Sequence, residues 1–127
     1  MSDAEHAYAI PMDPDDAFRA ISNSRRRQVI LSLAQSESAL TASELAVEIA
    51  AIENLVDPSE VTSEQRTRVY VSLVQSHLET LDRAGVVEYD ERGKRVSPTD
   101  ATEPVAGHVR RITTACYRPD AGRGDES

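Results

Sequence analysis

The sequence predicts a mainly α-helical fold with one small β-hairpin, an α+β arrangement around a single modest core. Three features of residues 62–97 lead to this prediction. They are a long segment with apolar residues at helical spacing, a glycine where that spacing ends, and two short apolar segments around a charged turn. The chain has 127 residues, the size of one domain with room for an added helix.

The first helical segment is expected to begin at Asp13-Pro14, because Asp is a favoured N-cap and Pro suits the first helical position. The tripeptide at 22–24 interrupts this segment, and residues 25–35 continue as a second helix. Apolar residues at helical intervals define the inward face of that second helix: Val29, Ile30, Leu33 and Ala34.

A third helix is expected from Thr41, whose spacing from Glu44 is that of a capping box, to about Asn54. Residues 55–61 are expected to form a loop, since Pro58 disfavours helical geometry at the residue before it.

The longest helix is expected to begin with a second capping box, formed by Thr62 and Gln65, and to run to Ala84. Gly85 ends it at a position where a left-handed cap is favoured. Its inward stripe consists of Val69, Leu73, Leu78 and Leu81.

The hairpin follows directly, with strands at 86–89 and 95–97 and a turn at 90–94. A last helix is expected over 102–116, with Thr102 as its cap. Four residues at intervals of four, three and four give this helix a narrow apolar seam that could pair two subunits: Val105, Val109, Ile112 and Cys116.

The domain organisation follows from these elements. Residues 13–98 form the main domain, and residues 99–117 form a C-terminal helix that is a possible dimerisation element. The polar segments 1–12 and 118–127 lack periodicity, so we expect disordered tails there.

Composition excludes several classes of protein. No apolar run approaches the ~18 residues that span a bilayer, and the acidic N-terminus lacks the apolar segment of a secretory signal. The single cysteine cannot form an internal disulfide, which fits a reducing cytoplasm. We therefore expect a cytoplasmic protein that does not associate with membranes.

The charge balance is unusual, with 22 acidic against 14 basic residues and Lys94 as the only lysine. Acid excess, arginine in place of lysine and few aromatic residues resemble proteins of extreme halophiles, whose carboxylates keep the surface hydrated in concentrated salt. An ordinary acidic cytosolic protein is the alternative. Residues 62–97 carry six basic and six acidic side chains, and six minus six is zero, so the net charge of −8 lies outside this segment.

A helix that leads directly into a hairpin is the second half of a winged helix-turn-helix. Three strings, SNSRRRQVILSLA (22–34), LTASELAVEIA (40–50) and SHLETLDRAGVVEYD (76–90), resemble winged-helix transcription regulators. They correspond there to the first helix, the second helix, and the recognition helix with its wing. The resemblance implies a winged helix-turn-helix with an additional C-terminal helix.

Over roughly residues 14–97 the chain is also similar to a haloarchaeal winged-helix family of largely unassigned function. That family carries an H-x-H-L-P-x-L pattern near residues 75–79. His77, Leu78 and Leu81 match this pattern, whereas Gln75 and Glu79 depart from it.

The outer side of the long helix supplies candidate contacts to DNA bases. Ser72, Gln75 and Ser76 lie opposite the inward leucines, and Gln can bond an adenine edge while Ser can bond a base or a phosphate. Glu79 shares this side and repels phosphate unless it accepts a hydrogen from cytosine. The alternative is that these residues form a solvated helix face.

Basic residues supply the candidate phosphate contacts. Arg66 and Arg68 either grip phosphate or pair with Glu64 and the acids of the preceding loop. The turn of the hairpin supplies three further cations for the DNA backbone: Arg92, Lys94 and Arg95.

Other conspicuous residues are interpreted as structural. Residues 25–27 are three arginines that span about 200° of a helix, so pairing with Asp15 and Asp16 is preferred over phosphate contact. His77 is interpreted as a partly buried structural histidine rather than a pH switch or ligand. Cys116 is interpreted as a packing residue rather than a redox sensor.

The sequence therefore predicts a sequence-specific DNA-binding transcription regulator that is not an enzyme and has no cofactor or metal site. Its expected partners are double-stranded DNA and a second copy of the chain. The alternative is a winged-helix module for protein interaction or dimerisation that does not bind DNA. In that case a protein partner would contact three residues that lie beside the inward stripe: Tyr70, Val71 and Val74.

Overall fold

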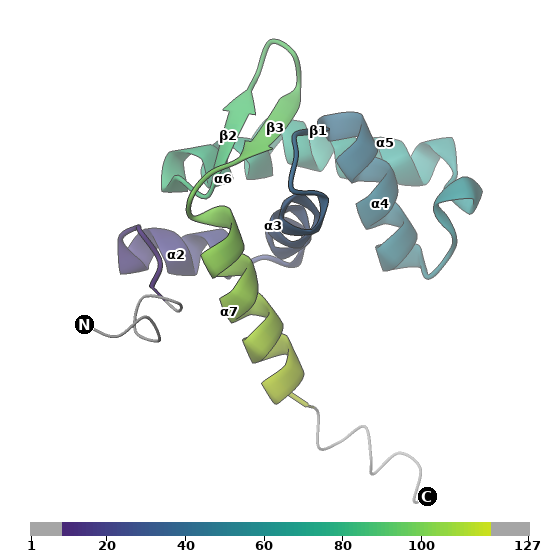
Figure 1. Ribbon diagram of the computed structural model, residues 1–127. Coiled ribbons are helices and arrows are strands. Elements are labelled where there is room, and N and C mark those ends of the chain that lie inside the picture. Colours follow the sequence, from purple (N-terminus) through teal and green to yellow (C-terminus); the bar gives the residue numbers. More distant parts are fainter. Residues whose placement is uncertain (1–8, 118–127) are drawn as a thin grey trace, which may run out of the picture.

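The computed structural model describes residues 9–117 and shows a mainly helical protein with a small antiparallel sheet (Figure 1). The tails predicted to be disordered lie outside the described residues, apart from residues 9–12. There, Ile10 and Met12 pack against the hydrophobic core, and the N–H of Met12 donates to the C=O of Ile10 at 2.8 Å. Contact with the core therefore begins before the predicted start at Asp13.

The first two helices are α2 (Pro14–Ile21) and α3 (Ser24–Ser36), separated where the sequence predicts a break. Asp13 caps α2, and its carboxylate accepts from the N–H of Asp15 at 2.8 Å. Asn23 caps α3 by accepting from the first free N–H groups of that helix. These two caps explain why α2 ends and α3 begins, in a new direction, within three residues.

The next helix is α4 (Ala42–Asn54), and both hydrogen bonds of its predicted capping box are present. The Glu44 N–H donates to the Thr41 hydroxyl at 3.0 Å, and the Thr41 N–H donates to the Glu44 carboxylate at 2.8 Å. The predicted loop over 55–61 contains one short 3-10 turn, Pro58–Glu60.

The predicted long helix is present, but it is not α-helical throughout. It consists of α5 (Ser63–Ser72), a π turn (Leu73–His77) and α6 (Leu78–Ala84), together called the rod. In the π turn the N–H of Leu78 donates to the C=O of Leu73, five residues earlier. The two leucines are five residues apart, and a π turn places both on the core side where an α turn would not.

Gly85 ends the rod with a φ of +86°, as predicted for a left-handed cap. The hairpin strands are β2 (Val87–Asp90) and β3 (Arg95–Pro98). A third strand, β1 (Leu40–Thr41), was not predicted because two residues are too short to show a strand pattern. The sheet is antiparallel in the order β1-β3-β2, with Leu40 opposite Val96.

The last helix is α7 (Thr102–Ala115), and its predicted cap is wrong. The Thr102 hydroxyl accepts from the N–H of Thr99 at 2.8 Å and donates to the C=O of Val86 at 2.6 Å. The Thr99 hydroxyl instead accepts from the N–H of Ala101 before the helix. Thr102 is thus buried and ties α7 to the beginning of the hairpin.

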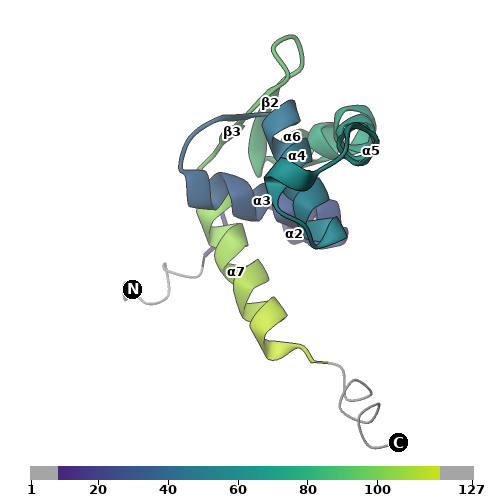
Figure 2. The same cartoon turned by 90° about the vertical axis from the view of Figure 1, so that its right-hand side faces the viewer.

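Helix α3 lies at the centre of the molecule and contacts α2, α4, α7 and the rod. In both views the hairpin and α7 extend from opposite ends of the molecule (Figures 1 and 2). Within residues 9–117, no helix is long and apolar enough to cross a membrane. The largest buried side chains come from α3, α4, the rod and the hairpin segment: Ile30, Leu33, Leu45, Ile49, Leu73, Leu78, Leu81, Val29, Val69, Val86, Val87 and Val96.

Candidate nucleic-acid interface

The outer side of the rod presents the predicted base-contacting residues. Gln75 and Ser76 are exposed within the π turn, and Ser72 is half-buried at the end of α5. The hydroxyl of Thr80 donates to the C=O of Ser76 at 3.1 Å. It supplies a partner for a carbonyl that lies where the α-helical bonding pattern is interrupted. The π turn therefore places two polar side chains in solvent on the side away from the core.

Ion pairs neutralise part of the rod's charge. Arg68 pairs with Glu64 at 2.7 Å, which is the alternative that the sequence left open for this arginine. Arg83 pairs with Glu79 one turn apart. Arg66 is half-buried, and its guanidinium makes no hydrogen bond or ion pair with the residues that the structure describes. Of the two predicted phosphate-gripping arginines on the rod, only Arg66 keeps an unengaged guanidinium.

The hairpin tip carries three cations without ion pairs among residues 9–117, Arg92, Lys94 and Arg95. The turn is held by the Asp90 carboxylate, which accepts from the N–H of Arg92 at 3.1 Å. A Cβ at Gly93 would lie 2.9 Å from that carboxylate, so any larger residue there would have to displace the Asp90 side chain. Lys94 itself adopts a φ of +51°.

Two hydrogen bonds fix the hairpin relative to the helices. The N–H of Tyr89 donates to the Asp82 carboxylate of α6 at 3.2 Å. The N–H of Ala42, the first residue of α4, donates to the C=O of Lys94 at 2.8 Å. The tip therefore projects from a base that is bonded to both the rod and α4.

Tyr89 lies between the hairpin and the rod and packs against the core. Its hydroxyl is buried and has no hydrogen-bond partner within the described residues. Burial raises the pKa of Tyr89, and the nearby Glu91 and Tyr70 raise it further.

The combined surface is close to neutral. The rod carries three arginines and three carboxylates, and three minus three is zero. The strands and turn of the hairpin, 87–98, also carry three of each. Neither element therefore presents a basic face, and the cations without ion pairs among residues 9–117 lie singly, at the hairpin tip and at Arg66.

The predicted pairing of the arginines at 25–27 with Asp15 and Asp16 is wrong. Arg25 forms two hydrogen bonds with Glu53 of α4, at 2.7 and 2.9 Å, and this side-chain bonding raises the pKa of Arg25. Arg27 donates to the C=O of Ile21 at 2.7 Å. The α2 acids have other roles, because Asp16 pairs with an arginine of its own helix.

Arg26 makes the contact that sequence analysis missed. Its guanidinium donates to the C=O of Arg19 at 2.8 and 3.1 Å and to the Ser22 hydroxyl at 2.9 Å. It also lies 3.3 Å from Nδ1 of His77 in the π turn, 51 positions away in the sequence. No local pattern connects two residues at that separation.

His77 is half-buried, as interpreted from the sequence. Burial lowers the pKa of His77, and the positive charges of Arg26 and Arg25 lower it further. The imidazole is therefore held neutral beside two cations. Residues 9–117 contain no cluster of three or more His, Cys, Asp or Glu side chains that could hold a metal ion.

The predicted dimerisation seam is divided by the fold. Val105 and Val109 are 1% and 2% exposed and belong to the chain's own core, where α7 packs on α3. They cannot contact a second subunit, because their side of α7 faces the core. Ile112 is 51% exposed, and Cys116 is also exposed, so the packing role expected for Cys116 is wrong.

The residues expected to cover a protein partner are also divided. Tyr70 and Val74 are partly buried and pack against the core, whereas Val71 is 41% exposed. A single valine is not an apolar patch.

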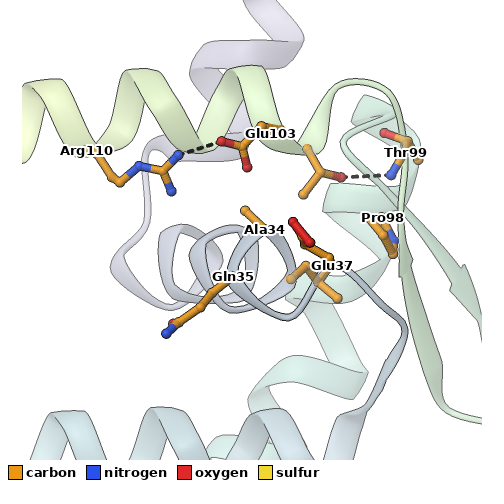
Figure 3. Close-up of a pocket in the computed structure, with 9 residues that line it drawn as sticks. Ala34, Gln35, Glu37, Pro98, Thr99, Glu103 and Arg110 are labelled. Atoms are coloured by element: carbon orange, nitrogen blue, oxygen red, sulfur yellow. Dashed lines mark hydrogen bonds and ion pairs between the residues drawn. The ribbon is translucent and has the colours of Figure 1, made fainter.

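A groove lies between the end of α3 and the beginning of α7, beside the end of β3 (Figure 3). Four of its polar residues bond one another in pairs. Arg110 pairs with Glu103 at 2.7 Å across one edge, and Thr99 bonds to Thr102 at the other. No set of unengaged groups converges on a bound molecule, so this groove offers no candidate chemistry.

Comparison with known proteins bears on the identity of the chain. Neither the curated proteins nor the solved structures gave a match. A family model described as a domain of unknown function, DUF7344, matches residues 18–97, from the fifth residue of α2 to the next-to-last residue of β3. The chain therefore belongs to the DUF7344 family.

Proposed function

We propose that this protein is a winged helix-turn-helix DNA-binding regulator of transcription. The rod enters the major groove, and the hairpin acts as a wing on the DNA backbone. One observation supports this proposal most strongly. The π turn exposes Gln75 and Ser76, and the rod that contains it contacts, through α6, a hairpin whose three cations have no ion pairs among residues 9–117.

The rod suits the major groove because an α-helix fits its width, and each base pair presents a distinct pattern of donors and acceptors there. Gln75 can bond an adenine edge with both amide atoms, and Ser76 can bond a base or a phosphate. Both side chains are exposed, while the opposite face of the rod is anchored in the core by Leu73 and Leu78. A rigid scaffold therefore presents a polar surface to the bases.

Phosphate contact falls to the cations of the rod and hairpin that form no ion pair among residues 9–117: Arg66, Arg92, Lys94 and Arg95. Four contacts give a slope of about −3.6 for the logarithm of the binding constant against the logarithm of salt concentration. The net charge of −8 opposes non-specific binding, so base contacts contribute a larger share of the affinity.

Fluorescence anisotropy with labelled duplexes tests the proposal, after a site has been selected from random DNA. Replacing Arg92 and Arg95 together by Ala should weaken binding similarly for all sequences and lower the salt slope by about 2. Gln75→Ala should change sequence preference by about 1–3 kcal/mol at one base pair. Arg68→Ala is the matched control, because Arg68 is already paired with Glu64.

Loss of binding in the Arg68 control alone, with no effect of the hairpin or Gln75 substitutions, would contradict the proposed mode. Absence of any selectable duplex would favour the alternative, a module for protein interaction without direct DNA binding.

A further inference from the structure

The structure contains an exposed apolar groove whose lining includes no residue of the rod or the hairpin. It lies between α2 and α7, and both helices contribute apolar residues to it. Phe18 is the only phenylalanine in the chain and is 68% exposed on α2. Ile112 faces the same groove from α7 and is 51% exposed. The remaining apolar lining comes from Ile10, Met12, Ala17 and Ile21.

The two helices that flank the groove differ in charge. Helix α2 with its cap has Asp13, Asp15 and Asp16 against one arginine, a net charge of one minus three, or −2. On α7, Arg110 and Glu103 pair with each other beside the groove between α3 and α7, which leaves Arg111 as the basic residue next to this groove. His108 also lines the groove from α7, and Arg111 lies beside it.

We propose that this groove is the contact surface of a two-fold homodimer, in which α2 of each subunit packs on α7 of its partner. A two-fold axis makes every contact occur twice, so the acidic edge of each subunit meets the basic edge of the other. Phe18 of one subunit then fills the apolar groove beside Ile112 of its partner. The acidic and basic edges make the patch complementary to itself, which favours a second copy over a different protein.

The dimer places the DNA-facing surface away from its axis. In Figures 1 and 2 the hairpin lies at the end opposite α7, so pairing through α2 and α7 leaves both hairpins exposed. Assembly through this groove does not depend on DNA binding, and its failure would leave the proposed function untouched.

Sedimentation equilibrium of the full chain in concentrated salt measures the assembly directly. The wild-type protein should be a dimer, and Phe18→Ser or Ile112→Ser should raise the dimer dissociation constant at least about tenfold. Leu55→Ser is the matched control, since Leu55 is 91% exposed at the far end of α4. It removes a similar apolar side chain and should leave the dimer intact. Circular dichroism verifies that each variant is folded.

A wild-type protein that stays monomeric, or a Leu55 variant that dissociates as readily as the Phe18 variant, would overturn the proposal. A charge swap tests the choice of partner. At low salt, Asp15→Arg or Arg111→Asp alone should weaken the dimer several-fold, and the two together should restore it. If the double variant is no better than the single ones, acidic and basic edges do not meet across a two-fold axis.

Discussion

Two clusters of three cations behave in opposite ways in this protein. The arginines at 25–27 on α3 form the densest basic run in the sequence, yet all three are bonded to other parts of the chain. Arg92, Lys94 and Arg95 at the hairpin tip are interspersed with acids, yet none has an ion pair among the described residues. The density of charge in a sequence therefore does not tell whether that charge is available to a partner.

The cause of the difference is the end of a helix. The last carbonyls of α2 have no partners within that helix, and α3 begins directly after it. Arg26 and Arg27 donate to the carbonyls of Arg19 and Ile21, so they satisfy the end of α2 and complement its negative dipole. The helix end beside the hairpin tip is instead the beginning of α4, which presents N–H donors and no free carbonyls, so Arg92 and Arg95 stay exposed.

The largest expected effect concerns the rod. The α3 arginine cluster contacts the rod at His77. Deleting Thr80 should rotate Leu81 by about 100° away from the core and destabilise the protein by several kcal/mol, or unfold it. Deleting Gln75 removes the extra residue of the π turn, leaving Leu73 and Leu78 four positions apart on one helix face, and the fold should persist. Chemical denaturation followed by circular dichroism measures both. Equal damage from the two deletions would show that the π turn does not set the register.

A smaller effect distinguishes the clusters directly. Arg26→Ala should lower the free energy of unfolding by about 1–3 kcal/mol, because it removes two hydrogen bonds to a helix-end carbonyl and the contact with His77. Arg92→Ala should change it by about 0.5 kcal/mol or less, since its side chain is exposed. The same denaturation experiment compares them. If the hairpin variant proves as destabilising as the α3 variant, the distinction between structural and available cations is wrong.

The sequence predicted local structure well where local physics decides it. Both capping boxes, the Asp13 and Asn23 breaks and the Gly85 stop follow from residues within a few positions of each other. What it missed depends on distant segments. The two-residue β1 exists only because β3 lies beside it, and the inward turn of Val105 and Val109 depends on where α3 packs.

The candidate interface shows the same division. Exposure of Gln75 and Ser76 followed from the inward leucines, because opposite faces of one helix are a local property. The sequence also holds a signal for the π turn, because the inward residues Leu73 and Leu78 are five positions apart. Assuming a uniform α-helical period along the whole rod hides that signal. The partners of the α3 arginines were not recoverable, because Glu53 and His77 are far away in the sequence.

A third effect, smaller again, compares a cation of the first cluster with one on the exposed rod. A double-mutant cycle on Arg25 and Glu53 should give a coupling of about 1 kcal/mol, because two hydrogen bonds hold a pair that is 25% and 31% exposed. The same cycle on Arg68 and Glu64 should give about 0.3–0.5 kcal/mol, because those side chains are 68% and 80% exposed. Unfolding free energies of the six single and double variants and wild type supply both values. A larger coupling on the rod would contradict the ranking.

The smallest expected effect is a pH dependence at the point where the α3 arginines meet the rod. The pKa of His77 in the folded protein is lowered below 6.5 by burial, then by Arg26 and Arg25, so the unfolded chain binds its proton more readily. Stability that is present above about pH 6.5 is therefore lost as the pH falls through that value toward the lowered pKa. The free energy of unfolding should decrease between about pH 7.5 and pH 5.5, and His77→Gln should remove that part of the decrease. His108→Gln is the control and should retain it, and a wild-type stability that rises on acidification in this window would contradict the assignment.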